Sequence, residues 1–183
     1  MIILELLVFL ITIIFLSLSF SGIGSLITFN TKSDFFINIF FGFIVVSLIV
    51  TFIHFFSKIN FLISGSIILV GITLVFWKKN PLISFKKKTS ILFLVVIFLL
   101  LPIFISQKYH EDFGYYHLPY SLAFIEEKIV FGFANIDLPY VYNSIWLNLY
   151  PIFFIENKNF DFLTLPSFLL FLSFIIFSIK NII

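Results

Sequence analysis

Long runs of apolar residues, separated by short polar segments, dominate the pattern along this chain. As a helix, a run of about 18 apolar residues is long enough to cross the hydrocarbon core of a bilayer. The pattern predicts spans at residues 2–21, 35–56, 59–77, 89–106, 138–155 and 162–179, the fifth being the weakest. We therefore expect an all-α polytopic membrane protein with about six transmembrane or re-entrant helices.

Several residues inside these runs qualify the picture. The first run has no basic n-region, no small-residue cleavage site, and Glu5 where a signal peptide would carry lysine, so we expect a retained helix. His54, near the end of the second run, is interpreted as an interfacial histidine. In the third run, Gly65 and Gly71, with neighbouring serines, predict close packing against other helices.

Composition supports a membrane protein and excludes several other classes. The chain is 61% hydrophobic and 11% charged, whereas soluble domains carry roughly 25% charged residues. A net charge of +2 is too small to indicate nucleic-acid binding. The absence of cysteine excludes disulfides and thiolate metal sites.

The lysines predict the orientation of the spans. There are eleven basic residues, all lysine, and five of them lie between the third and fourth spans: Lys78, Lys79, Lys86, Lys87 and Lys88. By the positive-inside rule this loop is cytoplasmic. Alternation of the spans then puts the Lys32 loop inside, and the Lys58 loop and residues 107–137 on the periplasmic or extracellular face of the inner membrane.

Residues 107–137 leave the apolar pattern and predict an amphipathic helix. Apolar residues recur at helical spacing, and acidic and basic residues follow on the other side: Leu118, Leu122, Ile125 and Ile129, then Glu126, Glu127 and Lys128. Pro119 suits a first turn and Gly132 suits a stop. We expect a short helix lying in the outer membrane interface, with an unstructured solvated loop as the alternative.

The stretch KYHEDFGYYHLPY, residues 108–120, concentrates titratable and aromatic side chains just before that helix. The carboxylates of Glu111 and Asp112 can act as bases. With His110 and His117 they are also possible ligands of a divalent cation, although the spacing is not His-Glu-x-x-His. Alternatively, the acids belong to a solvated loop and the tyrosines to an ordinary aromatic belt.

Polar residues also interrupt the weak fifth run. They are Asn135, Asp137, Asn143, Ser144 and Asn148. Polar stripes in membrane helices face other helices or an aqueous cavity rather than lipid. We therefore expect this segment to border a cavity or to lie shallowly in the membrane.

An acid, then Y-Y-H-L-P, then an amphipathic helix, then G-F-A-N-I and N-S-I-W resembles bacterial membrane glycosyltransferases of the GT-C type over about residues 100–155. The resemblance implies a polyprenyl-phosphate sugar donor in the membrane and an acceptor entering from outside. It also implies roles for specific residues. Asp112, with Glu111 as substitute, would be the general base or acceptor ligand, Tyr116 and His117 would lie near the donor, and Asn135 and Asn143 beside the cavity.

Enzymes of that type usually have more spans, a longer chain and fewer helices before the outward loop. We therefore expect residues 1–106 to form four spans, 107–137 the outward candidate site, and 138–183 the C-terminal membrane helices of an N-terminal portion. A second chain would then supply the missing helices. The alternative function is a non-enzymatic subunit or scaffold of envelope polysaccharide assembly. A lipid-linked sugar transporter is disfavoured, because ionisable residues are nearly absent deep in the spans.

Overall fold

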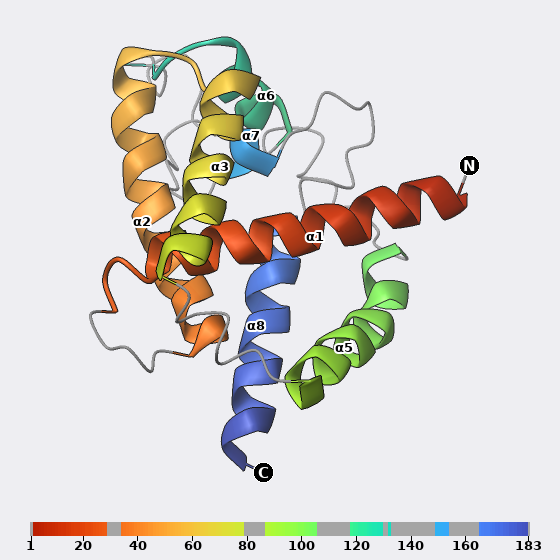
Figure 1. Cartoon of the computed structure of the whole chain (residues 1–183). Helices are drawn as coiled ribbons and strands as arrows, with labels where there is room; N and C mark the ends of the chain where they lie inside the picture. Colours follow the sequence, from red (N-terminus) through yellow and green to blue (C-terminus); the bar gives the residue numbers. More distant parts are fainter. Residues whose placement is uncertain are drawn as a thin grey trace.

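The computed structural model describes residues 2–28, 34–78, 87–105, 118–129, 132, 149–153 and 165–182. These residues form α-helices and no strand (Figure 1). The helices are α1 (Ile2–Gly24), α2 (Phe35–Phe56), α3 (Phe61–Lys78), α5 (Lys87–Ile105), α6 (Leu118–Glu126), α7 (Tyr150–Phe153) and α8 (Leu165–Ile182). The predicted all-α class is confirmed.

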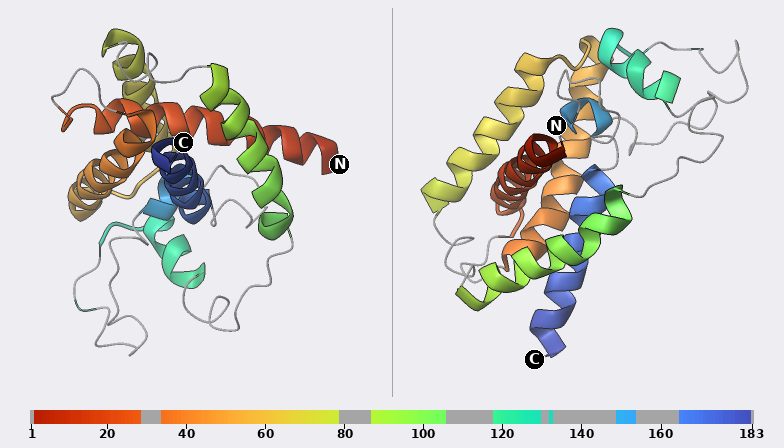
Figure 2. Two further views of the ribbon diagram at one scale, coloured as in Figure 1. Left: turned by 90° about the horizontal axis from the view of Figure 1, so that it is seen from below. Right: turned by 90° about the vertical axis from the view of Figure 1, so that its right-hand side faces the viewer.

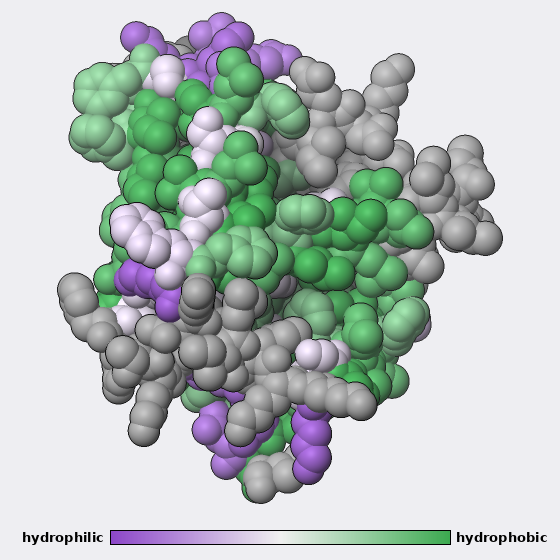
Figure 3. All heavy atoms as spheres, in the orientation of Figure 1, coloured by the Kyte–Doolittle hydropathy of each residue, from purple (hydrophilic) through white to green (hydrophobic). Residues whose placement is uncertain are grey.

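Helices α1, α2, α3 and α8 are each long and apolar enough to cross a membrane, and α5 contains a shorter apolar stretch, Lys88–Pro102. They correspond to five of the six predicted spans. The other, 138–155, falls largely outside the described residues, which include only 149–153. Many large apolar side chains on these helices are exposed, among them Leu62 at 74% and Trp77 at 82%. Figure 3 shows apolar residues over the middle of one face, with hydrophilic residues mainly towards two ends. This surface is suited to lipid.

Helix α1 runs across α2 and α3 rather than alongside them (Figures 1 and 2). Where α1 meets α3, two glycines face each other, and a Cβ added to Gly22 would lie 1.9 Å from the carbonyl oxygen of Gly71. A Cβ on Gly71 would lie 2.3 Å from the carbonyl oxygen of Ser19. The packing role predicted for Gly71 is therefore confirmed. It is wrong for Gly65 within the part of the chain that the structure describes, where a Cβ would meet no atom within 4 Å.

Helix α1 meets α2 through a second pair of glycines. A Cβ on Gly24 would lie 1.8 Å from the carbonyl oxygen of Asn38, and one on Gly42 would lie 2.0 Å from that of Phe20. Only hydrogen fits in these spaces, so the backbones approach closely enough for Cα–H···O contacts. Because lipid competes for apolar side chains, such close packing is the main force that holds membrane helices together.

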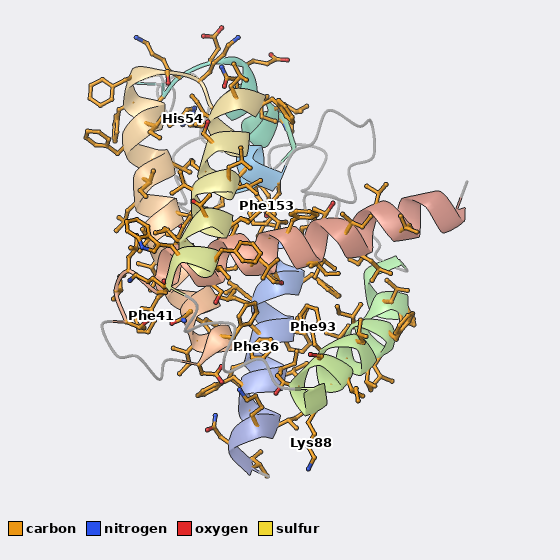
Figure 4. All side chains as sticks on the ribbon, in the orientation of Figure 1. Phe36, Phe41, His54, Lys88, Phe93 and Phe153 are labelled. Atoms are coloured by element: carbon orange, nitrogen blue, oxygen red, sulfur yellow. The ribbon has the colours of Figure 1, made fainter. Side chains whose placement is uncertain are left out.

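The centre of the fold is aromatic. The Phe20 ring of α1 lies 4.4 Å from Phe43 of α2 and 5.6 Å from Phe153 of α7, measured between centroids. Phe43 and Phe153 stack at 6.2 Å with an interplanar angle of 11°. Figure 4 shows Phe153 inside the bundle. The four-residue helix α7 is thus held in the core by a long-range cluster rather than by its own length.

One end of the bundle is basic, and we call Lys78, Lys88 and Lys180 the basic end. Asp34 caps α2 by accepting a hydrogen bond from the Phe36 N–H at 2.8 Å, and its carboxylate also pairs with Lys180 of α8. Lys78, at the end of α3, donates to the carbonyl of Ser25 just after α1 at 2.8 Å. Figure 4 shows Lys88 near the C-terminal half of α8. These contacts join the end of α3 to the end of α1 and the C-terminal turn of α8 to the start of α2. The Lys32 and Lys78–Lys88 loops themselves lie largely outside the described residues.

Candidate outward site

All six predicted site residues lie outside the part of the chain that the structure describes: Glu111, Asp112, Tyr116, His117, Asn135 and Asn143. The structure does describe the elements next to them, because α6 begins at the residue after His117 and residues 149–153 follow Asn148. Among the described residues, no group of three or more His, Cys, Asp or Glu side chains could hold a metal ion.

Covalent geometry limits how far the candidate residues can lie from these elements. Asp112 is six positions before Leu118 (118 − 112 = 6), which at about 3.6 Å per residue is at most about 22 Å. Asn143 is six positions before Leu149 (149 − 143 = 6), with the same limit. Since α6 and α7 pack against each other, both segments end at one part of the molecule.

Helix α6 has the two faces that the sequence predicts. Within the helix, Leu122 and Ile125 are partly buried and Glu126 is exposed; in the residues just after it, Glu127 and Lys128 are exposed and Ile129 is partly buried. The helix ends at Glu126, and the N–H of Glu127 closes its last turn on the carbonyl of Ala123 at 2.8 Å. It therefore stops before Gly132, the predicted stop, although Gly132 has the left-handed backbone conformation expected of a stop residue, with φ 83°.

The early end of α6 is explained by His54, in the last turn of α2. The Nε2 of His54 lies 2.9 Å from the carbonyl oxygen of Glu127, and the N–H of Ile129 donates to the carbonyl oxygen of His54 at 3.0 Å. A carbonyl only accepts, so Nε2 carries a proton and donates. The chain after Glu127 thus exchanges helical hydrogen bonds for two hydrogen bonds to α2.

The interpretation of His54 as an interfacial residue is wrong in one respect. The residue is near the end of α2, as expected, but it is 0% exposed and is enclosed by protein. The physical reason is that the last carbonyls of a helix have no partner within the helix, and at a bundle end they attract neighbouring N–H groups. A polar residue in the last turn of an otherwise apolar helix was the available signal, because such residues face protein rather than lipid.

A second contact joins α3 to α7. The hydroxyl of Ser64, which is 5% exposed, donates to the carbonyl of Pro151 at 3.2 Å. The turn between α2 and α3, residues 57–60, is itself well defined. The side chain of Asn60 caps α3 by accepting from the Ile63 N–H at 3.0 Å, and Ile59 is buried at 1% exposure.

The outward segment and the α2–α3 turn therefore lie at one end of the bundle, and α8 ends at the other (Figure 2, right). Of the predicted outward residues 107–137, only 118–129 and 132 are described, and residues 118–129 lie at the same end as the Lys58 turn. The exposed side chains at this end carry both signs of charge: Lys58, Glu126, Glu127 and Lys128. The described part of this end can hold an interfacial helix against the bundle and expose its charged face to water.

No curated protein and no solved structure matches the chain. A family model does match it, over residues 1–183, and the printed description of that family is Domain of unknown function (DUF8201). Since the match covers the whole sequence, the chain belongs to the DUF8201 family.

Proposed function

We propose that the protein is an integral membrane glycosyltransferase of the GT-C type, or part of one, acting on the outer face of the cytoplasmic membrane. The observation that carries the proposal is α6, an amphipathic helix that begins directly after the acidic and aromatic stretch and is fixed to the bundle end by His54. A lipid-linked donor has its phosphate at the membrane surface, so a base beside an interfacial helix is at the right depth for transfer.

In the proposed reaction the Asp112 carboxylate, with Glu111 as its substitute, removes the proton of an acceptor hydroxyl. The hydroxyl oxygen forms a bond to the anomeric carbon of the sugar, and the bond from that carbon to the phosphate oxygen breaks. The electron pair leaves with polyprenyl phosphate. Tyr116 and His117 would hold the donor's phosphate or sugar, and Asn135 and Asn143 would line the cavity.

The proposal is tested by sugar transfer from a polyprenyl-phosphate donor in membranes. Asp112→Asn should lower the rate by roughly 100-fold or more, the usual contribution of a general base. Glu126→Gln is the matched control, because this exposed carboxylate lies in the same outward segment, and it should leave the rate unchanged. Equal rates for wild type and Asp112→Asn would overturn the assignment of the base.

If a second chain completes the enzyme, transfer should require its co-expression. The alternative, a non-enzymatic subunit of envelope polysaccharide assembly, makes a different prediction. In that case Asp112→Asn has no effect on polysaccharide output even though deletion of the protein abolishes it. The comparison of the point variant with the deletion therefore separates the two functions.

A further inference from the structure

We infer that the turn end of the α2–α3 hairpin is an internal anchoring site for the outward region, with His54 and Ser64 as its positioning residues. His54 holds the chain just after α6, and Ser64 holds α7. His54 belongs to α2 and Ser64 to α3, so these two membrane-length helices also hold other parts of the chain in place. The anchoring stands on described contacts, and only its consequence for sugar transfer rests on the proposed function.

The His54 contact is unusual because one residue offers both a donor and an acceptor to the same partner segment. Its ring donates to the carbonyl of Glu127 while its own carbonyl accepts from Ile129, two residues further along. The two bonds fix the position and the direction of the segment, which a single bond would not. The His54 residue is itself 0% exposed and the hydrogen bond is partly buried, so loss of the ring donor removes the protein partner of the Glu127 carbonyl and weakens the hold on this segment.

The Ser64 contact holds α7, which follows the outward region in the chain. Ser47, Ser66 and Ser173 bond back to their own helices, Ser66 to the carbonyl of Leu62 at 2.7 Å. Ser64 instead donates across to Pro151. The three residues of α7 after Tyr150 are all buried, so α7 is already packed in the core. The hydrogen bond from Ser64 additionally fixes the orientation of α7.

Together the two contacts join the α2–α3 hairpin to two described parts of the chain, one just after α6 and one in α7. Ile129 is bonded to α2 and Pro151 to α3, and these helices are joined by a turn of only four residues, 57–60, with its own cap and buried side chain. The α2–α3 hairpin thereby sets the position of α6 relative to α7, and with it the position from which both candidate segments start.

The test is amide hydrogen exchange of the full chain in nanodiscs, read at residues 127–129 and 149–153. His54→Phe keeps a ring of similar size but removes the donor, and should speed exchange at 127–129 by up to about tenfold, the usual effect of one lost hydrogen bond. His54→Gln places an N–H donor the same number of bonds from Cβ and should restore slow exchange. Unchanged exchange in His54→Phe would overturn the inference.

Ser64→Ala provides a second variant that is small enough to keep the fold. It should speed exchange at 149–153 several-fold, whereas Ser66→Ala, the matched control on the same helix, should not. If neither His54→Phe nor Ser64→Ala changes exchange, the anchoring role is wrong. These measurements need no enzymatic activity, so they decide the inference even if the proposed function fails.

Transfer assays then connect the anchoring to the proposed function. His54→Phe should lower kcat with little change in KM, because the substrate groups remain and only their placement changes, and His54→Gln should recover the rate. An exchange response without transfer by any variant, including wild type with its partner chain, would leave the anchoring standing and reject the glycosyltransferase. Wild-type transfer rates in His54→Phe, together with faster exchange, would show that anchoring does not position the reacting groups.

Discussion

At the scale of single residues, polar side chains in this protein are used to join helix ends. His54 and Asp34 lie at opposite ends of α2. His54 makes two long-range hydrogen bonds to the chain after α6, and Asp34 makes one local and one long-range contact. Asp34 satisfies an N–H that the helix start leaves unpaired and also binds Lys180 from the other end of the chain. The chain has only nine acidic residues. Because Asp34 makes both a helix cap and an ion pair, it contributes more to stability than an exposed carboxylate does.

The two roles of Asp34 can be separated by substitution. Asp34→Ala removes the cap and the ion pair, and should lower the free energy of unfolding by about 1–2 kcal/mol. Asp34→Asn keeps a capping oxygen and loses only the charge, so it should cost less than half as much. Unfolding in a denaturing detergent series measures both. Lys180→Met should match Asp34→Asn, and an Asn variant as unstable as the Ala variant would contradict a capping role.

At the scale of elements, the crossing of α1 over α2 and α3 determines the architecture. Four glycines make the crossing, two on α1 and one on each partner helix: Gly22, Gly24, Gly42 and Gly71. The nearest atoms to an added Cβ are backbone carbonyls, which cannot move without displacing a helix. The close packing of α1 against α2 and α3 therefore requires glycine, which has no side chain, at these four positions.

Glycine substitutions test this dependence within one helix. Gly71→Ala should destabilise the fold by about 1–3 kcal/mol or more, because overpacking against backbone cannot relax through a rotamer change. Gly65→Ala, six positions earlier on α3, meets open space and should be neutral or slightly stabilising, since alanine favours helix. Thermal stability in detergent micelles is the measurement. Equal losses for both variants would mean that helix α3, and not the crossing, is sensitive to the added methyl group.

The position of the short helix α7 depends on the aromatic contacts of Phe153. Phe153→Ala leaves a cavity between α1 and α2 and should cost about 3–5 kcal/mol. Phe171→Ala on α8 removes a side chain that is 54% exposed and should cost far less. Detergent unfolding of the two variants gives the comparison. A mild effect of Phe153→Ala would show that α7 is held by other contacts.

At the scale of the whole molecule, the bundle has two chemically different ends. The basic end carries Lys78, Lys88 and Lys180, and the opposite end carries the α2–α3 turn and the charged face of α6. In a bacterial membrane the basic end is expected on the cytoplasmic side. This expectation is independent of any enzymatic activity.

The orientation can be measured directly because the chain has no cysteine. Single cysteines at Lys58, Lys128 and Lys88, all exposed positions, can each be labelled with a membrane-impermeant maleimide. Lys58→Cys and Lys128→Cys should react in intact spheroplasts, and Lys88→Cys only after the membrane is permeabilised. Reversal of all three would contradict the cytoplasmic assignment alone. Reaction of positions 58 and 128 from opposite sides would contradict the arrangement of the helices.

Most of the helices could be predicted from the sequence, because hydropathy and helical spacing are local properties. The ranges of α2 and α3 and the two faces of α6 followed from which residues are apolar and how they recur. The candidate acids were also chosen from local chemistry, and their roles stay predictions.

By itself, the sequence determined that this is an all-α membrane protein with a short amphipathic helix after the fourth long helix, because burial in lipid admits few other solutions for such a chain. Only the tertiary structure decided which glycines permit close contact, why α6 ends at Glu126, and that His54 faces protein. Each of these depends on which backbone carbonyl approaches from another helix. Which carbonyl lies close to a given residue is set by the crossing of α1 over α2 and α3 and by the packing around it. No local pattern of residues specifies a contact with a residue that is distant in the chain.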